Sequence, residues 1–597
     1  MSPEVMGWLL VGVPAGLGLI GLLLPRGHRP AAAALGVIGA ATALGLVIAL
    51  LVLGGTVSAS RPWISFGDLD VTLGIEVDRR ALLVALAVTC VALAVQVYSI
   101  GYLHDDERYA PYAAQISLFT AAMLLVVVSG DLIGLLIGWE VMGACSYLLI
   151  AHDRGLPEAP RAAVKAFLVT RVGDIGFLLG IVLLAVHAGS FRIADVLDAL
   201  PGMTSGVVTA SALLLLAGVA GKSAQFPLHT WLPDAMAGPT PISALIHAAT
   251  MVAAGVYVVA RLLPVFQSSP AALTVLGVLG AITLLLGALA ATAQADIKRV
   301  LAWSTVSQLG YMTGALAVGG DDAAIFHLLT HAAFKALLFL GAGCLIHAVG
   351  SNLLSQMGGL RKPLPVIFWC MTIGLAALAG VPPLAGFWSK EAILVAAEHG
   401  TGGAALIVYV AGLVGTFLTA WYAMRTWLLA FFGERNGPCH GVDRWMLGPV
   451  IALAVPAAGL GLGAWLVRDG LVELDGFVAI PLVLIAAGAF AAWRGWRTSG
   501  DPATILGSAG PFLASGFRLD DLQQALVVRP VVSLANLVRR ADESGVDGLV
   551  DGLGTGTLTA GGQLARWHRS GVPRALAGLL SLAAIAAVAF ALNGMLR

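Results

Sequence analysis

Charge is the scarcest feature of this sequence. Only 11% of its 597 residues are Asp, Glu, Lys or Arg, whereas soluble globular proteins carry about 25%. Hydrophobic residues make up 59% of the chain, and the net charge is zero. No soluble fold can remove that much apolar surface from water, and the zero net charge gives no support to nucleic-acid binding. The composition therefore predicts a protein whose solvent is the lipid bilayer.

Metal-binding and nucleotide-binding motifs are also scarce. The cysteines form no Cys-x-x-Cys pair and show no metal-ligand spacing, so we expect small apolar roles for Cys90, Cys145, Cys344, Cys370 and Cys439. One stretch, Gly16–Gly21, matches the dinucleotide-binding pattern letter by letter. It lies within an apolar run with no preceding strand, which favours a role in close helix packing. The sequence predicts no cofactor and no metal in this chain.

Apolar stretches of about 20 residues recur along nearly the whole chain. Each is long enough to cross a hydrocarbon core of ~30 Å as a helix, and the short alternating strands of a β-barrel are absent. We expect an all-α polytopic membrane protein with about sixteen spans, at residues 5–24, 30–54, 80–102, 113–129, 131–151, 161–187, 207–238, 240–263, 271–292, 296–318, 322–348, 364–396, 403–432, 446–467, 476–493 and 572–594.

Two of these spans, 207–238 and 364–396, contain proline and glycine that remove helical hydrogen bonds. Broken backbone at membrane depth is tolerated where it is buried or lines a cavity, and paired broken helices indicate an internal repeat. The two breaks are five spans apart, and an odd number of spans inverts the second unit. We therefore predict two inverted five-helix repeats with broken helices. The expected order is spans 1–3 in 1–110, the repeats in 111–265 and 266–435, and two further spans in 436–500.

The loop charges predict an orientation. Basic residues gather in the loops that follow odd-numbered spans, among them Arg26, Arg29, Lys298, Arg299, Arg361 and Lys362. By the positive-inside rule these loops face the cytoplasm, which would place both termini outside.

Lysine is used sparingly and in unusual places. The chain has six lysines and 33 − 6 = 27 arginines, yet five of the lysines fall within spans or at their edges. Lysine, unlike arginine, can release its proton when it is buried. Each charge at mid-membrane costs about 2.5–3.5 kcal/mol, so such residues are usually functional and paired. The lysine placement predicts proton transfer.

Other ionisable residues share these spans. Glu140 and Asp174 lie in the fifth and sixth spans, and His247 follows the first broken helix. His327, His331 and Lys335 recur at i, i+4 and i+8, which places them along one helix face. Structural alternatives exist: Lys165 and Lys298 could snorkel to the interface, Asp174 could simply hold a basic group, and the two histidines have the spacing of a metal site without a third ligand.

Three stretches, 221–252, 295–311 and 331–340, are specific enough to carry a family resemblance. They resemble the antiporter-like subunits of respiratory complex I and of multisubunit sodium/proton antiporters, and the whole chain is most similar to the L subunits (mitochondrial subunit 5) of NADH:quinone oxidoreductase. The tail favours this match. In L subunits a C-terminal lateral amphipathic helix precedes an anchoring span, here expected at 501–571 and 572–597. Pro530 and the glycines from Gly545 to Gly562 lead us to expect a kinked or irregular second half.

The resemblance implies a proton relay, residue by residue. Glu140 and Lys222 match the first charged pair, and Asp174 lies beside it. His247 and Lys298 match linking positions. His327, His331 and Lys335 match the central group, and Lys390 matches the terminal lysine of the second half-channel.

The resemblance also implies a setting. It places the chain in the bacterial inner membrane, where the lateral helix at 517–570 contacts neighbouring antiporter-like subunits of complex I. NADH, FMN, iron–sulfur clusters and quinone would be bound by partner subunits. A Mrp-type cation/proton antiporter subunit and a membrane-bound hydrogenase subunit would share the same core. A scaffold without transport is the alternative from another class, and the buried lysines argue against it.

Overall fold

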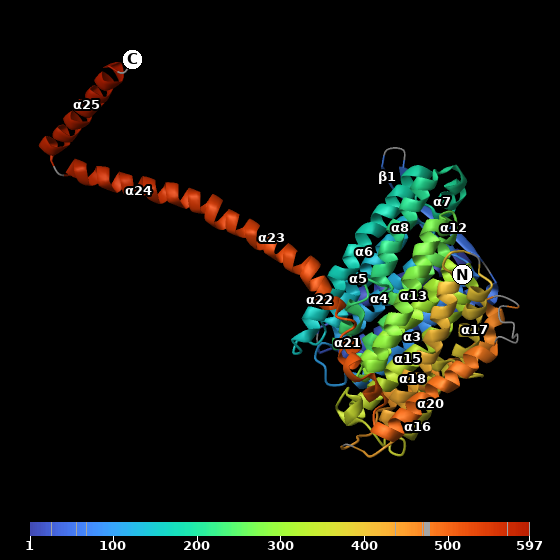
Figure 1. Cartoon of the computed structure of the whole chain (residues 1–597). Helices are drawn as coiled ribbons and strands as arrows, with labels where there is room; N and C mark the ends of the chain where they lie inside the picture. Colours follow the sequence, from blue (N-terminus) through green and yellow to red (C-terminus); the bar gives the residue numbers. More distant parts are fainter. Residues whose placement is uncertain are drawn as a thin grey trace. The chain divides into compact units, whose positions relative to one another are not determined.

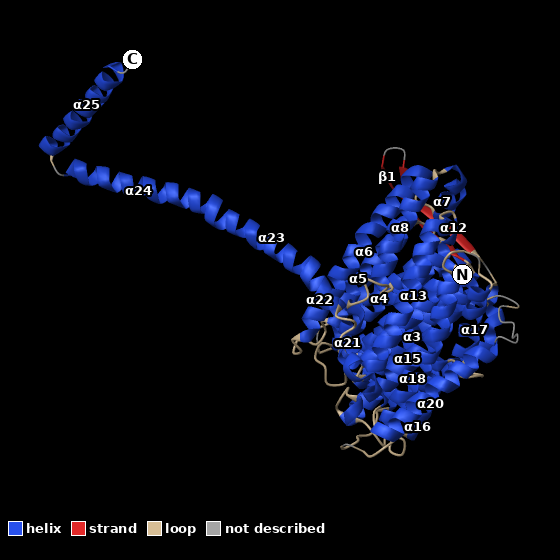
Figure 2. Cartoon of the chain, viewed as in Figure 1, coloured by secondary structure: helices blue, strands red, loops and turns tan. Residues whose placement is uncertain are grey.

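A computed structural model describes residues 1–25, 27–54, 56–66, 69–400, 402–435, 437–467, 470, 478–569 and 571–595. The chain divides into two units, Met1–Phe517 and Arg518–Arg597, and helices dominate both (Figure 2). Arg26, the start of the fifteenth expected span at 476–477, and the last two residues of the chain lie outside the described residues.

The first unit is a bundle of long apolar helices packed side by side (Figure 1). Their side chains either pack in the core or remain exposed where lipid would surround them, as along α6. The N-terminal members are α1 Pro3–Leu22, α2 Arg29–Leu53, α3 Arg79–Tyr102, α4 Tyr109–Val128, α5 Leu132–Ile150 and α6 Glu158–Ala188. They continue with α8 Ser205–Lys222, α13 Pro270–Ala293, α14 Ile297–Ala317, α15 Asp321–Val349, α18 Ala405–Phe431, α19 Arg444–Gly459 and α20 Ala479–Ser499.

Fourteen helices of the described chain are long and apolar enough to cross a membrane. This confirms the all-α polytopic prediction. Helices also occupy the two remaining expected spans. One is α14, and the other is the pair α16 Pro365–Ala379 and α17 Ala385–Glu398. The sixteen crossings and the inverted repeats stay predictions.

A β-hairpin, which the sequence analysis did not predict, lies between α2 and α3. Its strands are β1 Val57–Phe66 and β2 Leu69–Val77, paired antiparallel. The buried Asp131 carboxylate accepts the Gly74 N–H at 2.6 Å and caps α5 by accepting the Gly134 N–H at 2.5 Å. The hairpin is thereby fixed at the start of α5, at one end of the bundle (Figure 1).

Segments that the predicted topology places on the same side of the membrane contact each other. His152, after the fifth span, lies 2.8 Å from Asp106, after the third. Arg80, after the second span, pairs at 2.7 Å with Asp322, after the tenth. Arg80 and Asp322 lie in the first turns of α3 and α15, so each contact joins two segments that the predicted topology places at the same end of the bundle.

Both expected helix breaks are present. In the first, α8 ends at Lys222, and the chain resumes as α9 Trp231–Asp234. The second lies between Ala379 and Ala385. A third break was not predicted. The span expected to run unbroken over 240–263 is divided into α10 Thr240–Ala248 and α11 Met251–Arg261.

Side-chain hydrogen bonds hold the backbone at and around the breaks. At the first break the Phe226 N–H donates to Thr283 Oγ1 at 3.0 Å, and Ser223 Oγ donates to the Val252 carbonyl at 2.7 Å. At the third break Thr250 Oγ1 donates to the Leu245 carbonyl. These bonds explain how non-helical backbone can be held inside an apolar bundle.

The second unit consists of a long helical segment and α25 Val572–Met595. The segment is helical from Leu519 to Arg569, with π-helical turns at Gln524–Val528 and Ala541–Asp547. The second half, expected to be kinked or irregular, is helical and departs from α-helical geometry at the π-helical turn Ala541–Asp547. Isolated glycines lower helix propensity but keep every backbone donor. Residues 502–514 belong to the first unit, as a 3-10 helix Pro502–Ala509 and α21 Gly510–Ala514.

Candidate functional site

The most deeply buried ion pair joins two of the predicted residues. Lys222 Nζ, at the end of α8, lies 3.4 Å from Asp174 Oδ2 on α6, and their side chains are 0% and 2% exposed. Trp139 Nε1 donates to the other oxygen of Asp174 at 2.6 Å. Lys222 Nζ also lies 5.8 Å from the centre of the Trp139 ring. The pair is thus held between three helices, away from the surface.

Glycines allow these helices to approach. A Cβ at Gly173 on α6 would lie 2.5 Å from the Ala217 carbonyl oxygen on α8. A Cβ at Gly143 on α5 would lie 2.4 Å from Lys222 Nζ. Both distances are shorter than real Cβ contacts, so the ammonium reaches α5 and α6 only because these positions lack side chains.

Glu140 has a different partner from the one expected. Its carboxylate pairs at 2.5 Å with Arg171 on α6, and the two side chains are 30% and 37% exposed. Arg171 and Asp174 are one helical turn apart, so α6 presents a cation to Glu140 and an anion to Lys222. Among the described residues Glu140 forms no salt bridge with Lys222, although the two lie close enough to interact electrostatically. The structure has two neighbouring pairs where one was expected. Arg171 was not among the predicted residues, although an arginine inside an expected span was the available signal.

The two lysines suspected of snorkelling behave differently. Lys298 is buried, and its ammonium donates to the carbonyls of Met236 and Gly238, each at 2.7 Å. Its ammonium is therefore held by the end of the first broken span and is not exposed at the surface of the bundle. Lys165 is partly exposed and pairs with Asp234 at 2.6 Å.

A polar cavity of about 430 Å³ lies beside these lysines. Lys165, Asp234 and Arg299 line it, and Arg299 pairs with Asp234 at 3.5 Å. Asp234 therefore holds two cations at the N-terminal ends of α6 and α14. It was not among the predicted residues.

His229 is a second residue that the sequence analysis missed. It is completely buried in the first helix break, with its ring centre 5.7 Å from that of Trp303 and 6.2 Å from that of Phe226. Neither ring nitrogen has a hydrogen-bond partner among the described residues. Its position directly after the predicted break was the available signal.

The central group gathers on α15 as predicted. The Lys335 ammonium donates to the Leu301 carbonyl at 3.0 Å and to Ser304 Oγ, both on α14. The centres of the His331 and His327 rings are 6.2 Å apart. The i, i+4, i+8 face is thus a buried row of two imidazoles and an ammonium.

His247 and His327 connect this row to other helices. His247, at the end of α10, lies close enough to Lys298 and Lys335 to interact with both electrostatically. His327 Nδ1 lies 2.9 Å from Ser389 Oγ on α17, and its Nε2 lies 3.1 Å from Gln308 Oε1. Within the described residues no group of three His, Cys, Asp or Glu side chains could hold a metal ion.

Lys390, the last predicted residue, lies at the second break. Its ammonium donates to the Leu378 carbonyl at 2.7 Å and lies 5.3 Å from the centre of the Tyr311 ring. Gly380 ends α16 with φ of 87°, and a Cβ there would lie 3.5 Å from Lys390 Cδ. The lysine stem therefore runs along the break.

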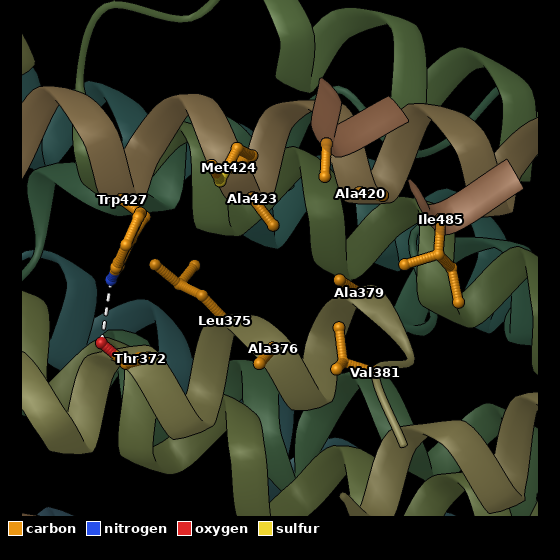
Figure 3. A pocket seen from close by; sticks show the side chains of 11 residues that line it. Thr372, Leu375, Ala376, Ala379, Val381, Ala420, Ala423, Met424, Trp427 and Ile485 are labelled. Atoms are coloured by element: carbon orange, nitrogen blue, oxygen red, sulfur yellow. Dashed lines mark hydrogen bonds between the residues drawn. The ribbon is translucent and has the colours of Figure 1, made fainter. Parts of the chain in front are cut away.

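An apolar cavity of about 270 Å³ lies beside this break and is lined in part by Ala379 and Val381 (Figure 3). Trp427 and Thr372 line it and share a hydrogen bond of 2.8 Å from Nε1 to Oγ1. None of its lining side chains is ionisable, so it forms no part of the relay.

Two family models and several relatives match this chain. Residues 129–419 match the family model described as NADH:quinone oxidoreductase/Mrp antiporter, TM. Residues 63–113 match NADH-Ubiquinone oxidoreductase (complex I), chain 5 N-terminus. NADH-quinone oxidoreductase subunit L of Neisseria meningitidis serogroup B is 42% identical over 74% of this chain and 72% of its own length. Subunit L of Mycobacterium tuberculosis is 40% identical over 83% of this chain and 82% of its own. The chain belongs to the NADH-quinone oxidoreductase subunit L family.

This member of the subunit L family also resembles a chain of a solved antiporter complex. A chain in the structure of the Mrp complex from Dietzia sp. DQ12-45-1b has a TM-score of 0.75 and is 26% identical. The match covers 98% of this chain and 63% of that chain. The chain is therefore an antiporter-like membrane subunit.

Proposed function

We propose that this chain translocates protons as a membrane-arm subunit of NADH:quinone oxidoreductase. The observation that carries the proposal is the burial of Lys222, Lys335 and Lys390, which are 0%, 0% and 3% exposed and lie at or beside helix breaks or on the histidine row. Lysines are rarely buried without a function because the ammonium loses its hydration.

The first step rests on the paired charges. Moving Asp174 away from Lys222 would leave the ammonium unpaired in a medium of low dielectric constant. Releasing the proton removes that cost. Arg171, one helical turn from Asp174 on α6, could draw that carboxylate toward itself whenever Glu140 on α5 releases it. Lys165 and Asp234 would load protons from the polar cavity.

The second step runs along the imidazole row. Lys298 and His247 would link the first break to Lys335 and His331. His327 and Ser389 would then lead to Lys390, because Ser389 precedes that lysine on α17. Water beside the broken helices would complete the transfers between groups that do not touch.

The assembly supplies the energy in this proposal. Partner subunits would carry NADH, FMN, iron–sulfur clusters and quinone, and their electron transfer would drive this chain. The helix from Leu519 to Arg569 would lie along neighbouring antiporter-like subunits, with α25 as its anchor. The membrane would be the bacterial inner membrane, with both termini outside.

A Mrp-type cation/proton antiporter subunit is the second candidate. The structural match to the Mrp complex favours it, whereas the 42% identity to a subunit L favours the first. Purification of the native assembly, with identification of its subunits and assay of NADH-dependent quinone reduction, separates the two. Recovery with antiporter or hydrogenase subunits alone would contradict the first proposal.

Lysine variants test the relay itself. Lys222→Ala and Lys390→Ala should each lower proton pumping in reconstituted vesicles at least tenfold, because each removes a titratable group from the only proposed route. Lys362→Ala, in an exposed loop, is the matched control and should pump normally. Normal pumping by both buried variants would refute the assigned route while leaving the assembly intact.

A further inference from the structure

A large apolar groove lies between α2, α3 and α19, away from the relay residues. Its volume is about 930 Å³, within the range of about 300–1,000 Å³ that is usual for ligand pockets. Leu44 on α2, Leu93 and Val97 on α3, and Leu453 on α19 contribute to its wall. Most of its surface is apolar, so the site suits a hydrocarbon chain.

Small side chains on α19 create the groove. Gly448, Ala452 and Pro456 recur at four-residue spacing and line it. Where the groove ends, the two helices meet directly, since a Cβ at Gly101 on α3 would lie 3.1 Å from Met446 Cγ. The groove is therefore built into the packing of α3 against α19.

A second cavity extends the groove along α3. It has a volume of about 150 Å³ and shares Cys90, Leu453 and Pro456 with the first, and it reaches Leu83. From Val97 to Leu83 helix α3 rises about 21 Å at ~1.5 Å per residue. One leaflet of a hydrocarbon core of ~30 Å is about 15 Å thick. The two cavities together are long enough for an acyl chain.

A cation and an aromatic residue stand at one end of the groove. Arg444 lies 5.7 Å from the centre of the Trp445 ring, and both residues line the groove and are exposed. In the described part of the chain Arg444 forms no ion pair. The adjacent Asp443 accepts the Trp445 N–H at 2.9 Å. Tryptophan and arginine favour the membrane interface, and a guanidinium binds phosphate with two hydrogen bonds.

We infer that this groove binds an anionic membrane phospholipid, with its phosphate on Arg444 and an acyl chain along α3. The charge at one end and the apolar length below it match the two parts of such a lipid. Phe326 and Leu329 of α15 line the inner cavity, so the acyl chain would also support the helix that carries Lys335. The inference does not depend on the proposed proton route.

Photo-crosslinking tests the inference. The purified native assembly would be placed in phosphatidylcholine vesicles that contain a photoactivatable phosphatidylglycerol, and crosslinked peptides would be mapped by mass spectrometry. We expect labelling of the peptides around Cys90–Val97 and Arg444–Pro456. A photoactivatable phosphatidylcholine should label them several-fold less, because it lacks net negative charge.

Variants distinguish binding of the lipid headgroup from binding of the acyl chain. Arg444→Gln should lower phosphatidylglycerol labelling about fivefold, the effect of one cation at an anionic lipid surface, and Arg444→Lys should retain most of it. Arg497→Gln is the control, since Arg497 also lies over a tryptophan, Trp493, at 5.6 Å but does not line the groove. Ala94→Phe should abolish groove labelling by both lipids, in assemblies shown to be intact by native electrophoresis.

Three outcomes would overturn the inference. Equal labelling by phosphatidylglycerol and phosphatidylcholine would show that the groove has no site for an anionic headgroup. Full labelling of Arg444→Gln would remove the role of its guanidinium. Labelling of other lipid-facing helices such as α18 with none in the groove would mean that another protein subunit covers it.

Discussion

The two halves of the relay compensate buried charge in different ways. In the first half each predicted charge has an opposite charge beside it, Lys222 with Asp174 and Glu140 with Arg171. In the second half Lys335 and Lys390 donate to carbonyl or hydroxyl oxygens. Neither of these lysines forms an ion pair among the described residues.

The difference bears on which groups can change charge. A buried ion pair is costly to break, because the partner that remains is left unpaired. An ammonium held by neutral oxygens can lose its proton without stranding an anion. We therefore expect the first half to act as the charged switch and the second half to hold the mobile proton.

The largest expected effect breaks the first-half pair. Asp174→Asn should lower the free energy of unfolding by about 3–5 kcal/mol, because it leaves Lys222 charged and unpaired. The thermal midpoint of the detergent-solubilised assembly measures the change. The double variant Asp174→Asn with Lys222→Met should recover much of the loss. A single variant as stable as the wild type would contradict the assignment of this pair.

The matching change in the second half should leave stability intact. Lys335→Met removes no ion pair and keeps the length of the side chain, so the thermal midpoint should stay or rise. Proton pumping in vesicles should fall about tenfold, which corresponds to about 1.4 kcal/mol. If the thermal midpoint fell as far as in Asp174→Asn, the contrast between the halves would be wrong.

An ion pair whose carboxylate, Asp501, lies outside the spans provides a smaller, pH-dependent effect. Arg425 on α18 binds Asp501 through two hydrogen bonds of 2.7 and 2.9 Å. Burial by itself raises the pKa of Asp501, but Arg425 holds it below its ordinary value. A lowered pKa in the folded state stabilises the protein above the unfolded pKa of about 3.9, and the contribution is lost as the pH falls through the folded pKa.

Asp501→Asn should therefore destabilise the assembly by about 1 kcal/mol at pH 7, a value reduced for partial exposure. Thermal midpoints of variant and wild type should converge below about pH 4. Glu107→Gln, at an exposed carboxylate, is the control. Its thermal midpoint should equal that of the wild type at neutral and at acid pH. A difference that persisted at acid pH would indicate lost packing and not lost charge.

The smallest expected effect concerns the position of Lys222. Gly143→Ala places a methyl group 2.4 Å from the present position of the ammonium, so the lysine must shift from Asp174. Pumping should fall about threefold, while stability should hold because alanine favours a helix by up to about 1 kcal/mol over glycine. Gly206→Ala on α8, which meets nothing within 4 Å, should leave pumping unchanged. Equal rates in the two variants would show that the ammonium does not need this space.

The sequence determined the elements that depend on local chemistry. Apolar length determined the long helices, and proline and glycine marked the breaks at Gly221 and Gly380. The spacing of His327, His331 and Lys335 determined their common face. These features follow from hydropathy and backbone geometry within one segment, and the structure agrees with each.

Only the tertiary structure decided how the charges pair. Which carboxylate meets Lys222 depends on how closely α5, α6 and α8 approach at Gly143 and Gly173, and no local pattern states that distance. The same holds for the direction of the Lys298 side chain, whose ammonium reaches the carbonyls of Met236 and Gly238. It holds too for the break at Thr250, where no proline or glycine marks the sequence; there the Thr250 hydroxyl itself donates to the Leu245 carbonyl. A buried charged side chain needs a partner because it has lost its hydration, and the packing of the helices decides which partner lies within reach.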